Sequence, residues 1–237
     1  MKKRNSKRAN APGVLLAIAV LASMAMPTSA AVLTFTDLPS WQAAVASSSL
    51  EDFEGATADD DFTFTAITSP NGDLGLSAVE ESTFTINAFI DVADGLGNYE
   101  SIGAGINGSA IVSMRFLSHT STPPDSVTVT LPAGLSAFAF DYNNYDTQGD
   151  GAELSFAGTN GATGPVFSTG TGFYGVVDTG VGATISSFTL TGHDAGGAGT
   201  SAFMSFDDVR YGTAIPEPTS LALLSLFGLT VLGTRRR

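Results

Sequence analysis

The sequence predicts an all-β body, a single antiparallel β-sandwich of the jelly-roll kind, between two terminal segments that direct export. Short runs of alternating apolar and polar residues fill the middle of the chain, and clusters of Gly, Asn, Asp and Pro separate them. No long stretch in this middle region repeats its apolar residues with the helical period of 3.6. The chain has 237 residues, which is enough for one such domain with terminal extensions.

Residues 1–31 are predicted to be a cleaved signal peptide. A basic stretch from Lys2 to Arg8 precedes an apolar run from Val14 to Met26, and small residues follow up to Ala31. The apolar run is short for a membrane span, and the small residues suit a signal-peptidase cleavage site. We therefore expect the mature chain to begin at about Val32.

Residues 32–212 are predicted to form the sandwich. A short helix over 39–46 would hold Trp41 against the edge of the sandwich. Glycine-rich stretches at 103–108, 158–164 and 192–199 are expected to be loops. Strands are expected where β-branched or aromatic residues alternate with polar ones, at 62–65, 83–86, 111–117, 127–131, 137–142, 152–156, 173–177, 188–191 and 203–211.

Residues 213–237 are predicted to be a sorting segment. The motif Pro216-Glu217-Pro218 precedes an almost wholly apolar run, 219–234, which we expect to be a single transmembrane helix. The uncharged stretch around it would reach roughly 25 Å as a helix, at the short limit for crossing a bilayer. A basic tail, Arg235, Arg236 and Arg237, should stay in the cytoplasm and stop transfer, which leaves the body outside.

This order of motif, apolar run and basic end resembles the sorting segment of the PEP-CTERM proteins of Gram-negative bacteria. The resemblance implies that an exosortase, a membrane-embedded cysteine protease or transpeptidase, recognises Pro216, Glu217 and Pro218 and removes the tail. It also implies release of the body towards the cell surface or extracellular matrix, often in bacteria that make exopolysaccharide and biofilms.

The body also resembles a loosely defined group of exported bacterial domains. The matching elements are Phe35-Thr36-Asp37 followed by Trp41, then Phe53-Glu54-Gly55, and the closing run from Phe206 to Gly212. These short motifs imply a fold more than an activity.

Charge excludes one class of partner. Residues 31–214 hold 22 acidic residues against two basic ones, Arg115 and Arg210, a net charge of −20. Nucleic-acid binding needs Lys and Arg to displace counterions from phosphates, so nucleic acid is not expected as a partner. The same charge disfavours anionic lipids and polysaccharides unless divalent cations bridge them.

The side chains available for catalysis are few, and we expect no enzymatic activity. The absence of cysteine excludes disulfides, thiolate metal sites and a cysteine nucleophile. The only histidines, His119 and His193, lack zinc-ligand spacing, and no Gly-x-Ser-x-Gly elbow precedes a helix. A glycoside hydrolase-like enzyme that uses paired carboxylates remains an open alternative.

Calcium is the cofactor that the sequence favours, because it binds six to eight oxygen ligands and can occupy weak sites outside the cell. One candidate site is Asp146, Gln148 and Asp150, spaced like the opening of a calcium loop, although Ala157 stands where the loop needs Glu. The alternative here is a hairpin turn that joins strands 137–142 and 152–156.

A second candidate calcium site joins the two ends of the body, with Asp52 and Glu54 near the first strand and Asp207 and Asp208 in the last. This arrangement resembles the structural calcium site of jelly-roll carbohydrate-binding modules. Adjacent carboxylates repel each other unless a cation lies between them. The alternative is that alternate members of each pair face solvent. The residues expected in the core on that alternative are Phe53, Phe206 and Val209.

The group Tyr142-Asn143-Asn144-Tyr145 offers aromatic rings and amides for saccharide binding, with a core or edge position as the alternative. We therefore expect a non-enzymatic, calcium-stabilised protein of the cell surface or extracellular matrix. Its expected partners are signal peptidase and the export machinery, an exosortase, the inner membrane through a transient C-terminal anchor, and exopolysaccharide. A carbohydrate-binding module is the first alternative, and the hydrolase is the second.

Overall fold

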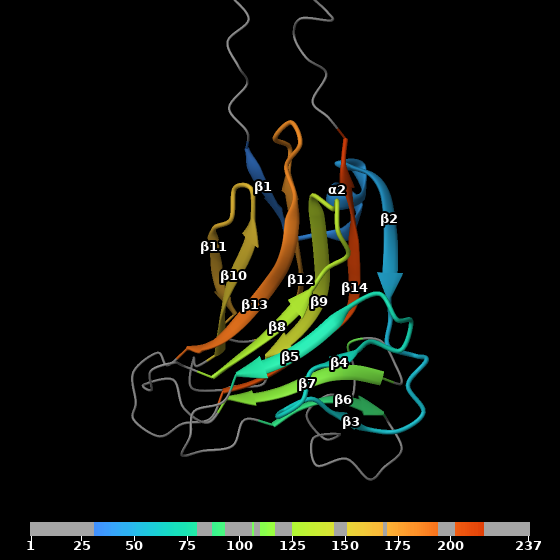
Figure 1. Ribbon diagram of the computed structural model, residues 1–237. Coiled ribbons are helices and arrows are strands. Elements are labelled where there is room, and N and C mark those ends of the chain that lie inside the picture. The colour runs from blue at the N-terminus through green and yellow to red at the C-terminus, as the bar shows by residue number, and fades with distance from the viewer. Residues whose placement is uncertain are drawn as a thin grey trace, which may run out of the picture. The chain divides into compact units, whose positions relative to one another are not determined.

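Two antiparallel β-sheets packed face to face make up the body of the protein (Figure 1). The computed structural model describes residues 31–79, 87–92, 106, 110–116, 125–144, 151–167, 170–193 and 202–215. All the elements lie in one compact unit, Ala30–Ile215, of the two into which the chain divides. The prediction of an all-β sandwich is confirmed.

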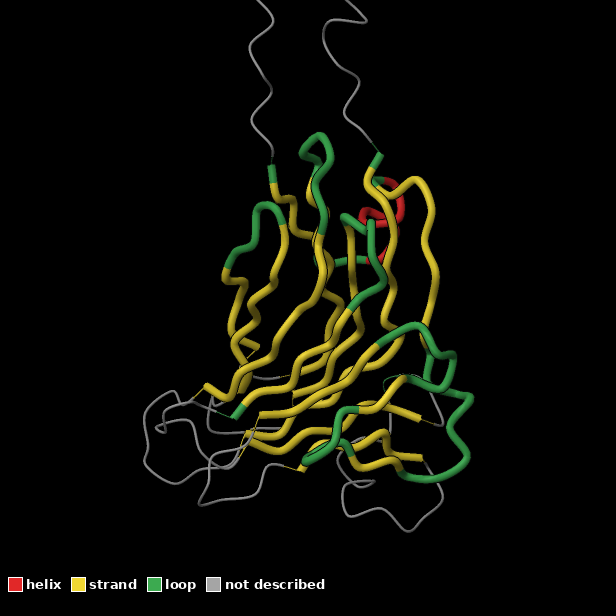
Figure 2. Tube along the Cα trace, viewed as in Figure 1, coloured by secondary structure: helices red, strands yellow, loops and turns green. Residues whose placement is uncertain are grey.

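The elements follow one another with a single helix among the strands (Figure 2). They are β1 (Val32–Phe35), α2 (Leu38–Ala43), β2 (Val45–Glu51), β3 (Asp60–Asp61), β4 (Ile67–Thr68), β5 (Gly75–Val79), β6 (Asn87–Val92), β7 (Ala110–Phe116), β8 (Ser126–Thr130), β9 (Ala137–Asn144), β10 (Gly151–Gly158), β11 (Thr163–Phe167), β12 (Gly170–Asp178), β13 (Ile185–His193) and β14 (Ala202–Ala214).

The strands divide between a larger sheet of eight and a smaller sheet of six. In the larger sheet the order is β1-β12-β9-β14-β7-β6-β3, and β2 also pairs with β14. In the smaller sheet the order is β11-β10-β13-β8-β5-β4. The last strand, β14, is therefore central, because it pairs with β9, β7 and β2.

Stacked phenylalanines from both sheets form the centre of the core. Phe138 and Phe140 on β9 both stack against Phe188 on β13, with ring centroids 4.8 and 5.1 Å from it. Phe206 on β14 completes the group, 5.9 Å from Phe140 and 6.0 Å from Phe188. Because successive side chains point to opposite faces of a strand, Ala139 between the two rings of β9 faces away from them and packs in a second buried cluster with Trp41.

The helix α2 covers one end of the outer face of the larger sheet. Asp37 caps it by accepting a hydrogen bond from the Ser40 backbone N–H (2.8 Å). The buried Trp41 indole donates to the Val176 carbonyl (3.3 Å) and lies against Gly175, where a Cβ atom would collide with the indole ring. The helix expected over 39–46, with Trp41 against the sandwich, is therefore present at slightly earlier residues.

Two predicted local structures are wrong. The strands β9 and β10 lie in different sheets, so no hairpin joins them. The residues after Phe62 do not form the strand predicted over 62–65, because the Asp61 side chain accepts a hydrogen bond from the Thr63 N–H (2.8 Å) and turns the chain there. The strand predicted over 83–86 and the membrane helix predicted over 219–234 lie outside the described residues. Within the described ranges, no helix has the length and apolar content needed to cross a bilayer.

Replacing Trp41 with alanine should lower the free energy of unfolding by about 3–5 kcal/mol, because a large buried ring is removed and Gly175 leaves no side chain to fill the space. Circular dichroism during denaturation would measure this free energy. Tryptophan fluorescence would not serve, because the variant lacks the one tryptophan of the chain. The matched control is Val181→Ala at a fully exposed position, which should stay within about 0.5 kcal/mol of wild type. Similar stability of Trp41→Ala and wild type would show that the helix is not packed as described.

Candidate functional site

A bulge in β14 defines the candidate site. The pairing of β14 with β9 shifts register between Asp207 and Arg210, and Asp208 takes a positive φ of 51°. Strict alternation would expose one of the two aspartates, but only 1% of Asp207 and 5% of Asp208 is exposed. The alternative that one member of this pair faces solvent is therefore wrong for Asp207 and Asp208, and the bulge is the physical reason.

The other predicted acid pair lies at the end of β2, which runs beside β14. Between Asp52 and Glu54, Phe53 turns into the core with a positive φ of 55°, and its ring meets Phe206 edge-on at 6.2 Å. The expected core positions of Phe53, Phe206 and Val209 are confirmed. Both non-glycine residues with positive φ among the described residues thus belong to the two acid-bearing segments.

Sequence reasoning missed a third acid in this region, Glu51. It is fully buried, and its carboxylate accepts hydrogen bonds from the backbone N–H groups of Phe53 (3.0 Å) and Asn71 (3.2 Å). Glu51 therefore holds the turn after β2. Its position as the last residue of a strand was not a signal that the sequence alone could supply.

Asp207 is the least compensated acid of the site. Its Oδ1 accepts a hydrogen bond from the Asp208 N–H (2.6 Å), whereas its buried Oδ2 has no hydrogen-bond partner. The pKa of Asp207 is raised to about 7, mainly because burial desolvates the carboxylate. The hydrogen bond from the Asp208 backbone lowers the pKa, and the negative charges of Asp208, Glu54 and Asp141 contribute to raising it.

A second buried polar atom lies on the same strand. Ser205 is 1% exposed, and its Oγ has no hydrogen-bond partner. It lies two residues before Asp207, so both side chains point to the same face of β14. Such unpartnered oxygens are costly to bury unless a ligand or ion satisfies them.

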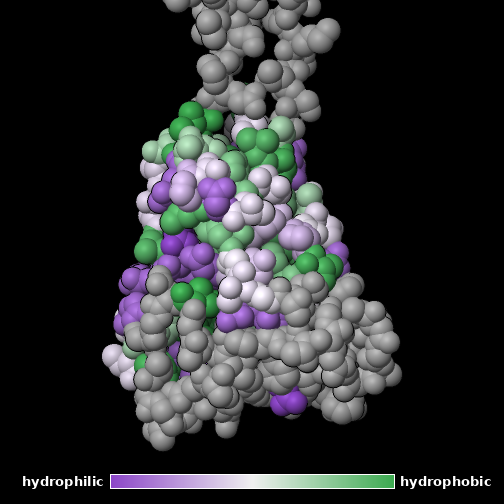
Figure 3. All heavy atoms as spheres, turned by 180° about the vertical axis from the view of Figure 1, so that it is seen from behind, coloured by the Kyte–Doolittle hydropathy of each residue, from purple (hydrophilic) through white to green (hydrophobic). Residues whose placement is uncertain are grey.

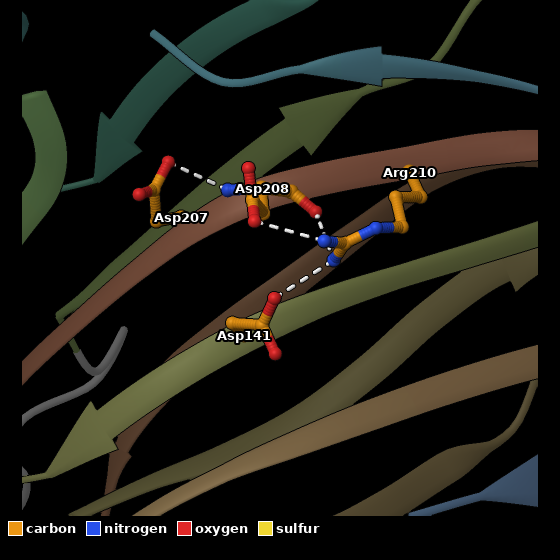
Figure 4. Close-up of polar contacts among 4 residues, drawn as sticks. All are labelled: Asp141, Asp207, Asp208 and Arg210. Carbon is orange, nitrogen blue, oxygen red and sulfur yellow. Dashed lines mark hydrogen bonds and ion pairs between the residues drawn. The ribbon is translucent and has the colours of Figure 1, made fainter. Parts of the chain in front are cut away.

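Arg210 links β14 to β9 across the bulge (Figure 4). Its guanidinium donates to Asp141 Oδ2 (2.8 Å), to Asp208 Oδ2 (2.8 Å) and to the Asp208 carbonyl (2.9 Å), and it lies 6.0 Å from the centre of the Phe173 ring. The carboxylate of Asp207 lies apart from this network in Figure 4, with its contact to the Asp208 backbone only. Arg210 thus compensates two of the three aspartates.

A polar pocket of about 450 Å³ opens beside this network. Its lining residues come from β9, β12 and β14 together with one residue outside the strands, and they are Ile106, Asp141, Tyr142, Thr171, Gly172, Asp208 and Arg210. On the face seen in Figure 3, the described hydrophobic and hydrophilic residues alternate in small patches.

The acids do not form a complete metal centre by themselves. In the part of the chain that the structure describes, no three His, Asp or Glu side chains are grouped as metal ligands. The Asp52 carboxylate accepts a hydrogen bond from the Glu54 N–H (3.3 Å). A calcium ion at Asp207 would also need carbonyl or hydroxyl oxygens, which calcium accepts readily. The other predicted calcium ligands, Asp146, Gln148 and Asp150, lie outside the described residues.

The predicted saccharide residues do not share one face. Tyr142 is half-buried against the core, with its ring 4.5 Å from that of Phe167, and the Asn144 side chain donates to the Phe167 carbonyl. Asn143 points to the opposite face of β9 by strand alternation and is 9% exposed. Tyr145, the sorting residues Pro216, Glu217 and Pro218, and Arg235, Arg236 and Arg237 lie outside the described residues.

No protein-family model matches the chain, and no curated protein matches it. Among solved structures, the K2 cleaved adhesin domain of Lys-gingipain is similar over 70% of this chain and 100% of that domain, with 13% identity and a TM-score of 0.42. The enzymatically active domain of tailspike protein 4 of bacteriophage CBA120 is similar over 59% of this chain, with 15% identity and a TM-score of 0.32. This chain spans only 19% of that tailspike domain. At these TM-scores the likenesses carry no argument about function.

Asp207 should make the metal-free protein less stable as pH rises from about 4 to 7. Its folded pKa of about 7 lies above its ordinary value of 3.8, so the folded state binds the extra proton in this interval and the free energy of unfolding falls with pH. A shift of this size corresponds to about 4 kcal/mol.

Denaturant titrations in EDTA at several pH values would measure the effect. Asp207→Asn should flatten the pH dependence, whereas the exposed Asp60→Asn should leave it unchanged. An equal slope in wild type and Asp207→Asn would contradict the assignment.

Proposed function

We propose that this is an exported, non-enzymatic protein of the cell surface or extracellular matrix, trimmed at both ends and stabilised by calcium. The observation that carries the proposal is the match between the folded unit, Ala30–Ile215, and the two predicted processing positions. The first strand begins at Val32, directly after the predicted signal peptide, and the last strand, β14, ends at Ala214, two residues before Pro216.

Hydrogen bonds at both ends support a body that is complete without its tails. The Ala31 carbonyl accepts from the backbone N–H of Thr179 (3.1 Å) and from its hydroxyl (3.0 Å). The Ile215 N–H donates to the Ala44 carbonyl (2.9 Å). Because the sheets and the core are built within these limits, removal of the terminal segments would take away none of the described strands.

Both ends of the body leave from the same end of the larger sheet. Ser136, just before β9, accepts a hydrogen bond from the Asp178 N–H through its carbonyl and one from the Ala214 N–H through its Oγ, both at 2.8 Å. Asp178 pairs with Val32 at the start of the body. The polar pocket at Asp141 lies about five residues further along β9, or roughly 17 Å. Attachment through the C-terminus would therefore leave the pocket accessible.

The proposed sorting step rests on the resemblance of residues 213–237 to the sorting segment of PEP-CTERM proteins. On this proposal a membrane helix over 219–234 holds the precursor in the inner membrane, with Arg235, Arg236 and Arg237 in the cytoplasm. An exosortase then cuts near Pro216-Glu217-Pro218, and the jelly-roll-like body passes to the surface or matrix. The marginal length of the helix suits a transient anchor.

Calcium is proposed at the acidic junction of β2 and β14, with Asp207 as the main ligand. The other predicted ligands are Asp52, Glu54 and the second carboxylate oxygen of Asp208, whose Oδ2 stays with Arg210. The buried, unpartnered Oδ2 of Asp207 supports this site, since a buried carboxylate is stabilised by a bound cation. Bound there, calcium would neutralise the Asp207 carboxylate and link the segment after β2 to β14.

Replacing Glu217 with alanine should leave the protein as an untrimmed, membrane-bound precursor, because the recognition motif is lost. Immunoblots of membrane, surface and medium fractions of the producing bacterium would measure trimming and release. Ser220→Ala in the same segment is the matched control and should be processed as wild type. Normal trimming of the Glu217→Ala protein would refute sorting at this motif.

Calcium should raise the melting temperature of the full chain by roughly 5–11 °C at about a hundred times its dissociation constant, since such occupancy adds about 2.7 kcal/mol. Calorimetry with calcium, with magnesium at equal ionic strength, and with EDTA would measure the shift. Asp207→Asn should abolish it and Asp60→Asn should retain it. Equal, small shifts with both ions would mean that calcium only screens the negative charge, and would leave the sorting proposal untouched.

A further inference from the structure

The pocket beside Arg210 combines several kinds of side chain on one face of three neighbouring strands. The register aligns Asp141 on β9 with Phe173 on β12 and with Asp207 on β14. In the next aligned row, Thr171 and Ser205 lie on either side of Asn143. Because residues two apart share a face, these rows place carboxylates, hydroxyls, an amide and an aromatic ring together on the outer face of the larger sheet.

The charged groups of the pocket are held in fixed positions. Asp141 on β9 and Asp208 on β14 both form ion pairs with the Arg210 guanidinium. The side chains of Asp141, Asp208 and Arg210 are 27%, 7% and 13% exposed. Asp141 is thus the most accessible of the three. A network that is already ordered loses little conformational entropy when a ligand binds, which favours recognition here.

The charge balance selects the class of ligand. Arg210 faces two aspartates in a body with a net charge of −20, so an anionic ligand is repelled. A small cation would have to displace the guanidinium from its carboxylates. A neutral polyhydroxyl compound avoids both costs, because each hydroxyl can donate to Asp141 and accept from an Arg210 N–H or from the Thr171 hydroxyl.

The pocket also offers an apolar contact and a suitable size. Ile106 lines it, and the Phe173 ring lies under the guanidinium that forms part of its wall. Sugar rings present C–H groups on one face and hydroxyls at the rim, and this combination matches such a lining. The volume of about 450 Å³ falls within the usual range of small-molecule pockets, about 300–1,000 Å³.

We propose that the pocket between β9, β12 and β14 binds a neutral saccharide, with Asp141 and Arg210 hydrogen-bonding adjacent hydroxyls and Thr171 at the rim. The site differs from the sequence-predicted group at 142–145, with which it shares only Tyr142. The inference rests on the proposed extracellular role for its biological setting, whereas the binding itself needs neither tail cleavage nor calcium at Asp207.

Titration calorimetry of the full chain in a non-ionic detergent without sugar headgroups would test the proposal. The probes are two neutral polysaccharides, dextran and laminarin, with anionic alginate as the charged comparison. We expect at least one neutral probe to bind and alginate not to bind. Failure of both neutral probes, or tighter binding of alginate, would overturn the proposal.

Two variants locate the binding in this pocket. Asp141→Asn should weaken binding about 10-fold or more, because it removes a charged acceptor, and leaves Arg210 paired with Asp208. Thr171→Ala, at an exposed position outside the ion-pair network, should weaken it about 2- to 10-fold. The exposed Thr34→Ala on β1 is the matched control and should bind as wild type.

Circular dichroism would establish that each variant is folded, and Thr171→Trp would add a second test by filling the rim of the pocket. Wild-type affinity in both Thr171→Trp and Asp141→Asn would overturn the assignment of the site. C-terminal trimming and the calcium-induced rise in melting temperature would be measured on the same variants. Normal trimming and a normal rise without saccharide binding would refute this inference alone and leave the proposed function standing.

Discussion

The stacked phenylalanines between the sheets are the contacts on which the rest of the structure depends. Phe138 and Phe140 point inward from β9 and stack against Phe188, while Phe206 points inward from β14. With these rings inside, strand alternation places Asp141 on the outer face of β9. The same alternation that builds the core therefore determines which side chains can form a site.

The bulge between Asp207 and Arg210 breaks this alternation in β14, and the ion pairs of Arg210 lie beside it. Burying adjacent carboxylates is unfavourable, and Arg210 compensates Asp141 and Asp208 with direct ion pairs. Arg210 is one of only two basic residues between positions 31 and 214. Asp207 is left with one buried oxygen unpartnered, which connects the proposed cation site to the shape of the backbone.

The strands with strong alternation could be predicted from the sequence, and those without it could not. Alternation of Thr with Val, Phe or Leu predicted β8 and β13, and alternation of Ala with Phe predicted β9. The strand β2, with the sequence VASSSLE, lacks a regular apolar face, and among the described strands it pairs with β14. The alternating residues 62–65 do not form a strand, since Asp61 turns the chain locally. For the candidate site, Asp207 and Asp208 were identified from their sequence context, while Glu51, Asp141 and Arg210 were not.

The sequence alone determined local properties: the negative charge of the body, the alternating strands and the helix that carries Trp41. Each depends on residues close together in the chain, where short-range sterics and burial patterns suffice. The tertiary structure decided that β9 and β10 belong to different sheets, that both aspartates of the bulge are buried, and that Arg210 pairs with Asp141, 69 residues away. These features depend on long-range strand register, which becomes defined only when the two sheets pack around their shared core.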